Sequence, residues 1–367
     1  MNQERFKKLV CGQSKGTLIV VSRFLLNVMA AFYGLVIAFR NFLYSRGLLK
    51  SYSITQGGLI TTDRTQATIP VICVGNITVG GTGKTPMVIW LCQWFRSKDI
   101  NCVILTRGYK AAKGENDEPE ILKKNCPGSA VIISPDRLKG AMEAVRRYRA
   151  QVLIMDDGFQ HRRLHREIDI VMVDATEPFG FGKMLPAGLL REPITSLKRA
   201  QAAVITRSDQ VSEDKSAEII KNINPNIVIA KAVHQPVCAM AADKQIHIEQ
   251  LKGRRVYAFC GIANPEAFLS TIKSLAAEVV GSKIYDDHHK YTAGDVGEIF
   301  DKAERAEAEF ILTTEKDYNK IDLSATGKKG LVLAFVAVRM KLLSGEEQIT
   351  QLIERSLAGK IPRKRNV

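Results

Sequence analysis

The feature that most constrains this chain is a glycine-rich loop between a short apolar run and an apolar helical pattern. Residues 69–74 are mostly aliphatic, and the loop that follows closes with Gly80-Gly-Thr-Gly-Lys-Thr85. Glycines in such a loop let backbone N–H groups turn toward phosphate oxygens, while the lysine and threonine add a cation and an Mg²⁺ ligand. Residues 86–96 are predicted to form a helix whose N-terminus faces the phosphates. The pattern favours a nucleotide-binding unit over a structural glycine turn.

The predicted ATP-binding residues are those of the loop itself. One of them departs from the common GxxxxGK[ST] pattern, because Thr78 stands where the first glycine is expected. The full set is Thr78, Val79, Gly80, Gly81, Thr82, Gly83, Lys84 and Thr85.

A second motif lies downstream, where the apolar run 152–156 ends in the acidic pair Asp156 and Asp157. A carboxylate at the C-terminal end of a strand beside a phosphate loop can hold the Mg²⁺ that bridges the phosphates. Taken alone, the motif could equally be an Asp-Gly turn after a buried strand. Beside the loop, the metal-binding interpretation is favoured, and we predict Thr85 and Asp157 as metal contacts.

Composition limits the number of domains and the kinds of binding partner that this chain can have. The 367 residues are 46% hydrophobic, which suffices for two or three domains with buried cores. A net charge of +15 indicates an anionic partner, such as a nucleotide, a nucleic acid, a phosphorylated substrate or an acidic membrane surface. The seven cysteines show no CxxC spacing, which indicates a reduced cytosolic protein without a Cys-ligated zinc site.

The N-terminal region contains an apolar stretch, residues 24–39, between Arg23 and Arg40. It is shorter than the ~20 residues that span a bilayer, so we predict an amphipathic helix over residues 18–45 lying in the membrane interface. One face is predicted to carry polar or small residues (Arg23, Asn27, Ala30, Gly34, Asn41, Ser45) and the other apolar ones (Phe24, Leu25, Val28, Phe32, Leu35, Val36, Phe39, Leu43). A signal peptide, a buried helix and a spanning helix are the alternatives.

Beyond residue 68, short apolar runs alternate with helical patterns. This alternation is typical of an α/β fold in which helices sandwich a mainly parallel, P-loop NTPase-like sheet. We expect an N-terminal membrane-associated region (1–50), a kinase core (51–235), a linker (236–250) and a smaller C-terminal α/β domain (251–367).

Eight separated motifs, in order, resemble those of the tetraacyldisaccharide 4'-kinase family. They are the loop 74–86, Leu105-Thr-Arg-Gly-Tyr109, Asp117-Glu-Pro119, Asp156-Asp-Gly-Phe-Gln-His161, Leu185-Pro-Ala-Gly-Leu-Leu-Arg-Glu-Pro193, Thr206-Arg-Ser-Asp209, Asp287-His-His289 and Thr314-Glu-Lys-Asp317. The resemblance covers nearly the whole chain, including Arg40-Asn-Phe-Leu-Tyr44.

The resemblance implies an activity and a location. The family's enzymes move the γ-phosphate of ATP, with Mg²⁺, onto the 4'-hydroxyl of an acylated glucosamine disaccharide 1-phosphate, forming lipid IVA in lipid A (lipopolysaccharide) biosynthesis. They act from the cytosolic face of the bacterial inner membrane as peripheral, monotopic proteins on an anionic lipid surface.

The same resemblance assigns residue roles. It implies Asp117 as the catalytic base with His288 as its partner, beside the loop's Lys84, and it adds Glu192 to the metal contacts. From the residues alone, Asp117 reads as a loop residue and His288 could belong to a metal site without further ligands. Gln160, His161 and Arg191 are expected near the substrate. The motifs 206–209 and 314–317 receive no role.

Two other functional classes compete. A dimeric ATPase with a deviant phosphate loop would carry a lysine where Val79 stands. A basic nucleic-acid-binding ATPase would suit the charge, but no basic strand with interleaved aromatics and no helix-turn-helix pattern is found, so no nucleic acid is expected.

Overall fold

The computed structural model describes residues 17–63, 65–108, 117–211, 213, 215–242, 244–262, 264–287, 289–322 and 331–361. The chain folds into two compact units. The first comprises Met1–Ala232 and Leu342–Val367, and the second comprises Val233–Lys341.

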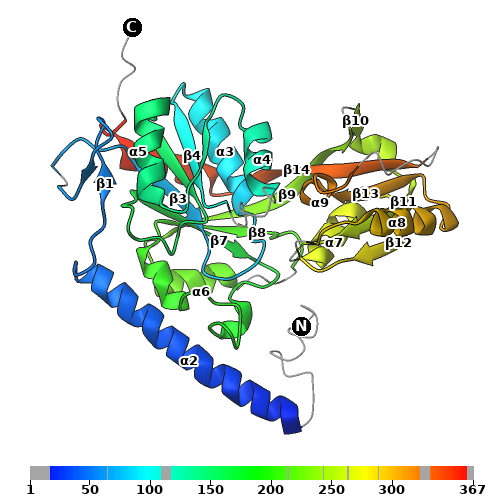
Figure 1. Ribbon diagram of the computed structural model, residues 1–367, viewed down its shortest axis with the longest axis horizontal. Coiled ribbons are helices and arrows are strands. Elements are labelled where there is room, and N and C mark those ends of the chain that lie inside the picture. Colours follow the sequence, from blue (N-terminus) through cyan, green and yellow to red (C-terminus); the bar gives the residue numbers. More distant parts are fainter. Residues whose placement is uncertain are drawn as a thin grey trace. The chain divides into compact units, whose positions relative to one another are not determined.

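The first unit is built on a parallel sheet with the strand order β9-β8-β7-β3-β6-β4-β5 (Figure 1). Strands β3, β4, β6, β7 and β8 are buried at every residue, as expected for parallel strands covered on both faces. Strand order reverses around β3, and ligands bind beyond the carboxyl ends of strands at such a point. The bounds are β3 Val71–Gly75, β4 Cys102–Thr106, β5 Val131–Ile133, β6 Val152–Asp156, β7 Ile168–Asp174, β8 Ala202–Thr206 and β9 Val228–Ala241.

Helices and a small hairpin complete this unit. The hairpin pairs β1 (Ser53–Ile54) with β2 (Ile60–Thr61) in antiparallel fashion. Helix α5 shows why the helices start where they do, because the Asp136 side chain accepts hydrogen bonds from two backbone amides of its first turn. The helices are α2 Thr17–Ser45, α3 Lys84–Ser97, α4 Asp117–Asn125, α5 Arg137–Tyr148, α6 Ser216–Ile223 and α10 Glu346–Leu357, with short 3₁₀ turns η2 Gly180–Gly182 and η3 Ile194–Arg199.

Helix α2 is a single helix of 29 residues, about 43 Å long at the standard rise. A narrow stripe that includes Ala30, Tyr33, Gly34, Arg40 and Asn41 is partly or fully buried against the rest of the first unit. The predicted apolar face is exposed at Phe24, Leu25, Val28, Phe32, Leu35, Val36 and Phe39. The two-faced prediction is therefore correct for most positions. The exceptions are Leu43, which is partly buried, and Asn27 and Ser45, which are exposed and donate to carbonyls of the helix itself.

The second unit is a smaller α/β sheet with the order β12-β11-β13-β14-β9, and β10 pairs antiparallel with β9. Alternate residues of β11 face two cores, Val256 and Ala258 toward α7 and Tyr257 and Phe259 toward α8. The bounds are β10 Lys244–His247, β11 Arg255–Cys260, β12 Glu278–Ile284, β13 Phe310–Thr314, β14 Val332–Ser344, α7 Pro265–Ser274, α8 Ala293–Arg305, α9 Glu315–Tyr318 and the 3₁₀ turn η4 Ile248–Leu251.

The structure differs from the predicted domain boundaries at two places. The expected linker 236–250 is mostly ordered strand, because β9 continues through Pro236 to Ala241 and β10 pairs with it. The expected C-terminal domain 251–367 ends early, because β14 leads back and α10 joins the first unit. Helix α10 buries Ile349, Ile353 and Leu357 on one face. The predicted fold class is confirmed.

Candidate active site

The glycine-rich loop leaves the central strand β3 and leads directly into α3. Gly83 caps the helix in the left-handed region (φ +85°), and Gly80 has φ +117°, which residues with side chains rarely adopt. In the part of the chain that the structure describes, apart from each glycine and its two chain neighbours, no atom lies within 4 Å of where a Cβ on Gly80 or Gly81 would be, so the backbone here is open. Open backbone ahead of a helix N-terminus is the arrangement that binds phosphate.

Hydrogen bonds within the loop and to the segment 189–190 hold its backbone in place. Asn76 Nδ2 donates to Thr82 Oγ1 at 3.1 Å, and both residues are buried. The Val79 amide donates to the Leu189 carbonyl at 2.8 Å, and Thr78 bridges to Leu190. The motif 185–193 thus forms one wall of the loop.

Two residues that received no role from the sequence also brace this loop. Thr206 Oγ1 donates to the Thr82 carbonyl at 3.1 Å, and Arg207 Nη2 donates to the Gly81 carbonyl at 2.9 Å. Arg207 is itself ion-paired with Asp174, which ends β7. Asp174 ends β7 and Arg207 directly follows β8. Because the carboxyl ends of parallel strands share one edge, these two charged residues are the sequence feature that could have indicated a pair beside the loop.

The acidic pair divides into two environments. Asp156 is buried, and its Oδ1 has no hydrogen-bond partner among the described residues. Burial, together with the charges of Glu118 and Asp157, raises the pKa of Asp156 to about 7. Since Glu118 contributes, the first turn of α4 lies near this carboxylate.

Asp157 is held as a carboxylate by two cations. Lys84 Nζ lies 3.5 Å from Oδ1, and Arg191 Nη1 donates to both carboxylate oxygens at 3.0 and 3.1 Å. Burial acts to raise the pKa of Asp157, but the charges of Lys84 and Arg191 outweigh it and the pKa is lowered. The structure therefore joins the loop, the acidic motif and the 185–193 motif at one carboxylate.

The donor set fits Mg²⁺ in a nucleotide site. Within the described residues, no group of three or more His, Cys, Asp or Glu side chains is placed to hold a metal ion. Mg²⁺ is usually bound through one or two carboxylates, with substrate phosphates and waters completing the octahedron. The buried, unpartnered Asp156 Oδ1 and the nearby Asp157 meet that requirement.

Glu192, predicted as a metal contact, is buried in an ion pair. Arg199 donates to both of its carboxylate oxygens at 2.8 and 2.9 Å, and Asn41 Nδ2 donates to Oε2 at 3.0 Å. Burial acts to raise the pKa of Glu192, but Arg199 outweighs it and the pKa is lowered. Its observed partners are therefore an arginine and α2, and its metal role stays a prediction.

The residues expected near the substrate gather where α2 contacts the loop region. Gln160 Nε2 donates to the Asn76 carbonyl at 2.9 Å, and Arg40 donates to the Gln160 carbonyl at 2.5 Å. Tyr33 on α2 donates to the Arg191 carbonyl at 3.1 Å. His161 Nε2 is buried without a hydrogen-bond partner among the described residues, and burial, then the charges of nearby arginines, lower the pKa of His161 to about 4.

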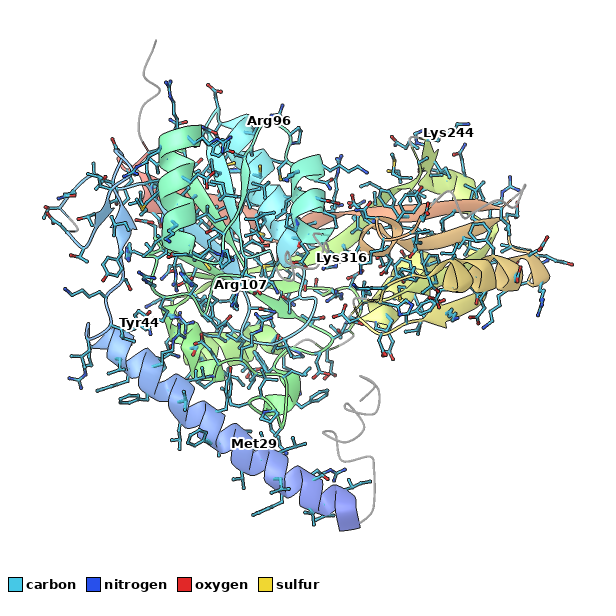
Figure 2. All side chains as sticks on the ribbon, viewed as in Figure 1. Met29, Tyr44, Arg96, Arg107, Lys244 and Lys316 are labelled. Atoms are coloured by element: carbon cyan, nitrogen blue, oxygen red, sulfur yellow. The ribbon has the colours of Figure 1, made fainter. Side chains whose placement is uncertain are left out.

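Figure 2 labels two residues of α2, Met29 and Tyr44. Met29 is 58% exposed on the apolar face, and the Tyr44 ring lies under the guanidinium groups of Arg40 and Arg162, at 5.5 and 5.1 Å.

Of the three residues predicted as catalytic, Lys84, Asp117 and His288, only Lys84 has a described side chain. Asp117 is the first residue of α4, rather than a loop residue, and its side chain is not described, while His288 lies outside the described residues.

Comparison with known proteins decides the family. A family model described as tetraacyldisaccharide-1-P 4'-kinase matches residues 22–358. The chain belongs to this kinase family. Tetraacyldisaccharide 4'-kinase of Syntrophus aciditrophicus is 36% identical over 87% of this chain and 89% of its own length, and that of Elusimicrobium minutum is 35% identical over 88% and 89%.

A solved family structure agrees with this assignment. LpxK from Aquifex aeolicus, crystallised in complex with ATP, is 30% identical, covers 91% of this chain and 99% of its own, and superposes with a TM-score of 0.67. The family resemblance inferred from eight motifs is therefore confirmed over nearly the whole chain.

Proposed function

We propose that this kinase transfers the γ-phosphate of ATP to the 4'-hydroxyl of tetraacyldisaccharide 1-phosphate, forming lipid IVA in lipid A biosynthesis. The observation that carries the proposal is the meeting of Lys84, Arg191 and Asp157 beside an open phosphate loop. Family membership supplies the acceptor, and the loop supplies the donor site.

The loop would hold the ATP phosphates through its backbone amides and Lys84. The Lys84 ammonium lies at the start of α3, so it and the helix N-terminus present positive charge to the same anion. Thr206 and Arg207 hold two loop carbonyls, which fixes the backbone before ATP arrives. Such preorganisation avoids ordering the site during the reaction.

We propose Thr85, Asp157 and Asp156 as Mg²⁺ contacts, with Glu192 as a further contact through water. Bound there, the ion would neutralise phosphate charge during transfer. The contribution of this chain is to keep Asp157 ionised and oriented, which Arg191 does with two hydrogen bonds. Orientation by such outer partners usually matters for metal affinity.

For the acceptor proton, we propose Asp117 as the base with His288 as its partner. A carboxylate paired with a histidine stays oriented and shares the proton load near neutral pH. The charge of Glu118, next to Asp117, acts on Asp156, which supports a place for the start of α4 beside the acidic pair.

We further propose that the acceptor approaches along α2, past Gln160, His161 and Arg191. Tyr33, Arg40 and Asn41 connect α2 to these residues or their neighbours by hydrogen bonds. A lipid held in the membrane by its acyl chains would then present its sugar headgroup to the polar stripe of the helix.

The membrane proposal rests on α2 as well. By length and composition, Ile19–Ser45 is the one described helix that could cross a membrane. The helix makes polar contacts with the rest of the first unit from Tyr33 to Asn41. Its exposed aliphatic and aromatic side chains extend from Val20 to Phe42. A helix that is polar along one side is suited to the interface, so we propose a peripheral enzyme on the cytosolic face of the inner membrane.

The direct experiment is transfer of labelled γ-phosphate from ATP to tetraacyldisaccharide 1-phosphate in mixed micelles. We expect wild-type protein to label the lipid and folded Lys84→Ala to lose the activity, because no other described cation of the loop can replace the ammonium. Near wild-type turnover by Lys84→Ala would overturn the assignment of the donor site.

A further inference from the structure

Three segments of the second unit meet at the carboxyl ends of adjacent parallel strands. Gly261 follows β11, residues 285–291 follow β12, and the motif Thr314–Asp317 ends β13 and opens α9. Lys316 marks that motif in Figure 2. The segment after β12 contains the position of His288. The sequence singled out both motifs but gave no role to Thr314–Asp317.

Asp317 connects this motif to the neighbouring strand. Its side chain is fully buried, and Oδ2 accepts hydrogen bonds from Thr314 Oγ1 at 2.7 Å and from the Gly261 amide at 2.9 Å. Oδ1 lies 3.7 Å from Lys320 Nζ. The bond to Thr314 belongs to the cap of α9, but the bond to Gly261 reaches the end of a different strand.

Gly261 is in turn covered by the segment after β12. A Cβ on Gly261 would lie 3.1 Å from the Asp286 carbonyl oxygen and from Tyr291 Oη, and 3.2 Å from His289 Cβ. Those distances are too short for a comfortable side chain, so the segment packs directly on the glycine backbone. Asp317 therefore fixes the backbone against which Asp286, His289 and Tyr291 pack.

Aromatic contacts hold the same segment on both sides of position 288. The Tyr285 and His289 rings stack with centroids 4.4 Å apart, and Tyr291 packs edge-on against Tyr285, His289 and Phe259 at 5.0–5.5 Å. Tyr291 Oη is buried near Asp317, and burial first, then the charge of Asp317, raise the pKa of Tyr291. The phenol thus stays protonated beside the carboxylate.

We propose that Asp317 is a positioning residue that acts through Gly261 and Tyr291 to hold the described residues on both sides of position 288, namely 285–287 and 289–291. The proposal rests on the catalytic role given to His288 in the proposed function. It gives the Thr314–Asp317 motif a task in the reaction, although Asp317 need not touch either substrate.

Burial of charge argues against a role in packing alone. Burying a carboxylate costs free energy unless strong partners compensate, and an apolar residue of similar size would pack without that cost. By hydrogen-bond geometry, neither Asp317 Oδ1 nor Tyr291 Oη has a partner among the described residues, although the Asp317 carboxylate is close enough to act on the Tyr291 phenol and raise its pKa. The two buried polar groups thus lie near each other without a well-formed bond, which is not the arrangement that stability alone would favour. The buried Asp317 carboxylate is better explained by its bond to the Gly261 amide, which fixes the backbone beneath the segment that contains position 288.

The test is a double-mutant cycle on the full-length protein in mixed micelles. Asp317→Asn, His288→Ala and the double variant are compared for kcat, KM for ATP and thermal stability. We expect Asp317→Asn to lower kcat by roughly tenfold or more, with KM for ATP unchanged and with little further loss in the His288→Ala background. Tyr291→Phe, which removes one hydroxyl, should lower kcat in the same pattern and serves if Asp317→Asn does not fold.

A matched control lies at the other end of the same strands. Glu309 also accepts a hydrogen bond from a backbone amide, that of Arg255 at 3.2 Å, and Glu309→Gln should leave kcat unchanged. A full, multiplicative loss from Asp317→Asn in the His288→Ala background would overturn the positioning role while leaving the kinase assignment intact. Wild-type kcat in His288→Ala alone would instead overturn the catalytic role of His288, and the positioning proposal with it.

Discussion

Arg191 donates to both carboxylate oxygens of Asp157, at 3.0 and 3.1 Å, from a segment 34 residues further along the chain. The same carboxylate lies 3.5 Å from Lys84 of the phosphate loop. The Asp157 carboxylate thus connects the phosphate loop, the acidic pair and the motif 185–193. The charges of Lys84 and Arg191 outweigh the effect of burial and lower the pKa of Asp157, which favours its charged form.

Arg191→Ala should weaken Mg²⁺-dependent activity by roughly 10–100-fold, because the carboxylate loses the partner that orients it. The measurement is the Mg²⁺ concentration that gives half-maximal phosphate transfer. Arg163 is a matched control, since its side chain is 53% exposed, forms a long ion pair with Asp136 at 3.9 Å, and lies 5.9 Å from the Tyr52 ring centroid. Equal Mg²⁺ requirements for Arg191→Ala and Arg163→Ala would contradict the role of Arg191.

Thr206→Val removes the hydroxyl that holds the Thr82 carbonyl and keeps the shape of the side chain. We expect KM for ATP to rise several-fold and the free energy of unfolding to fall by about 1 kcal/mol, the usual contribution of a buried hydrogen bond. Thr313→Val is the control, because Thr313 is equally buried in a strand but its hydroxyl has no hydrogen-bond partner among the described residues. An unchanged KM in Thr206→Val would mean that the loop does not need this brace.

Much of the site was predictable because the strongest signals are local. The loop, the acidic pair and their strands are contiguous in sequence, and the structure places them at one sheet edge. The bonds from Arg191 to Asp157 and from Arg207 to Gly81 were not predictable, because they join segments 34 and 126 residues apart. Topology suggests a shared edge, but it does not say which side chains pair.

The fold predictions likewise succeeded for local features and failed for features that depend on distant segments. Strand β6 is observed at Val152–Asp156, which is the apolar run, ending in the acidic pair, that the sequence indicated. The second half of strand β9 lies in the predicted linker 236–250, because Pro236 and a mixed polarity obscure the strand pattern there. The return of α10 to the first unit depends on which surface buries Ile349 and Ile353, and the amphipathic pattern of the helix alone does not identify that surface.

Acid should destabilise the protein partly through His161. Its pKa of about 4 in the folded protein lies below the ~6.5 of an unfolded chain, so the unfolded state binds the proton more readily. This contribution to stability is complete above about pH 6.5 and is lost as the pH falls through 4. We expect it to amount to roughly 1–2 kcal/mol after allowance for partial exposure. Urea unfolding at several pH values should show a shallower pH dependence for His161→Gln, and an unchanged dependence would contradict this.

Charges on the apolar face of α2 should release the protein from membranes. Phe32 and Val36 are exposed on that face, and each large apolar side chain buried in lipid contributes about 1.5–3 kcal/mol. Phe32→Asp with Val36→Asp should move much of the protein into the soluble fraction in vesicle flotation. A control with the same charge change is Val338→Asp with Leu343→Asp, both exposed on β14. Equal release by the two pairs would argue against α2 as the membrane contact.

If the enzyme phosphorylates one hydroxyl of the acceptor, an acceptor with hydrogen in place of the 4'-hydroxyl cannot be phosphorylated. With labelled ATP and Mg²⁺ in mixed micelles, we expect rapid labelling of tetraacyldisaccharide 1-phosphate and none of the 4'-deoxy analogue, at equal lipid concentration. Labelling of both acceptors at similar rates would show that phosphate enters at another position, and the 4'-kinase assignment would be wrong.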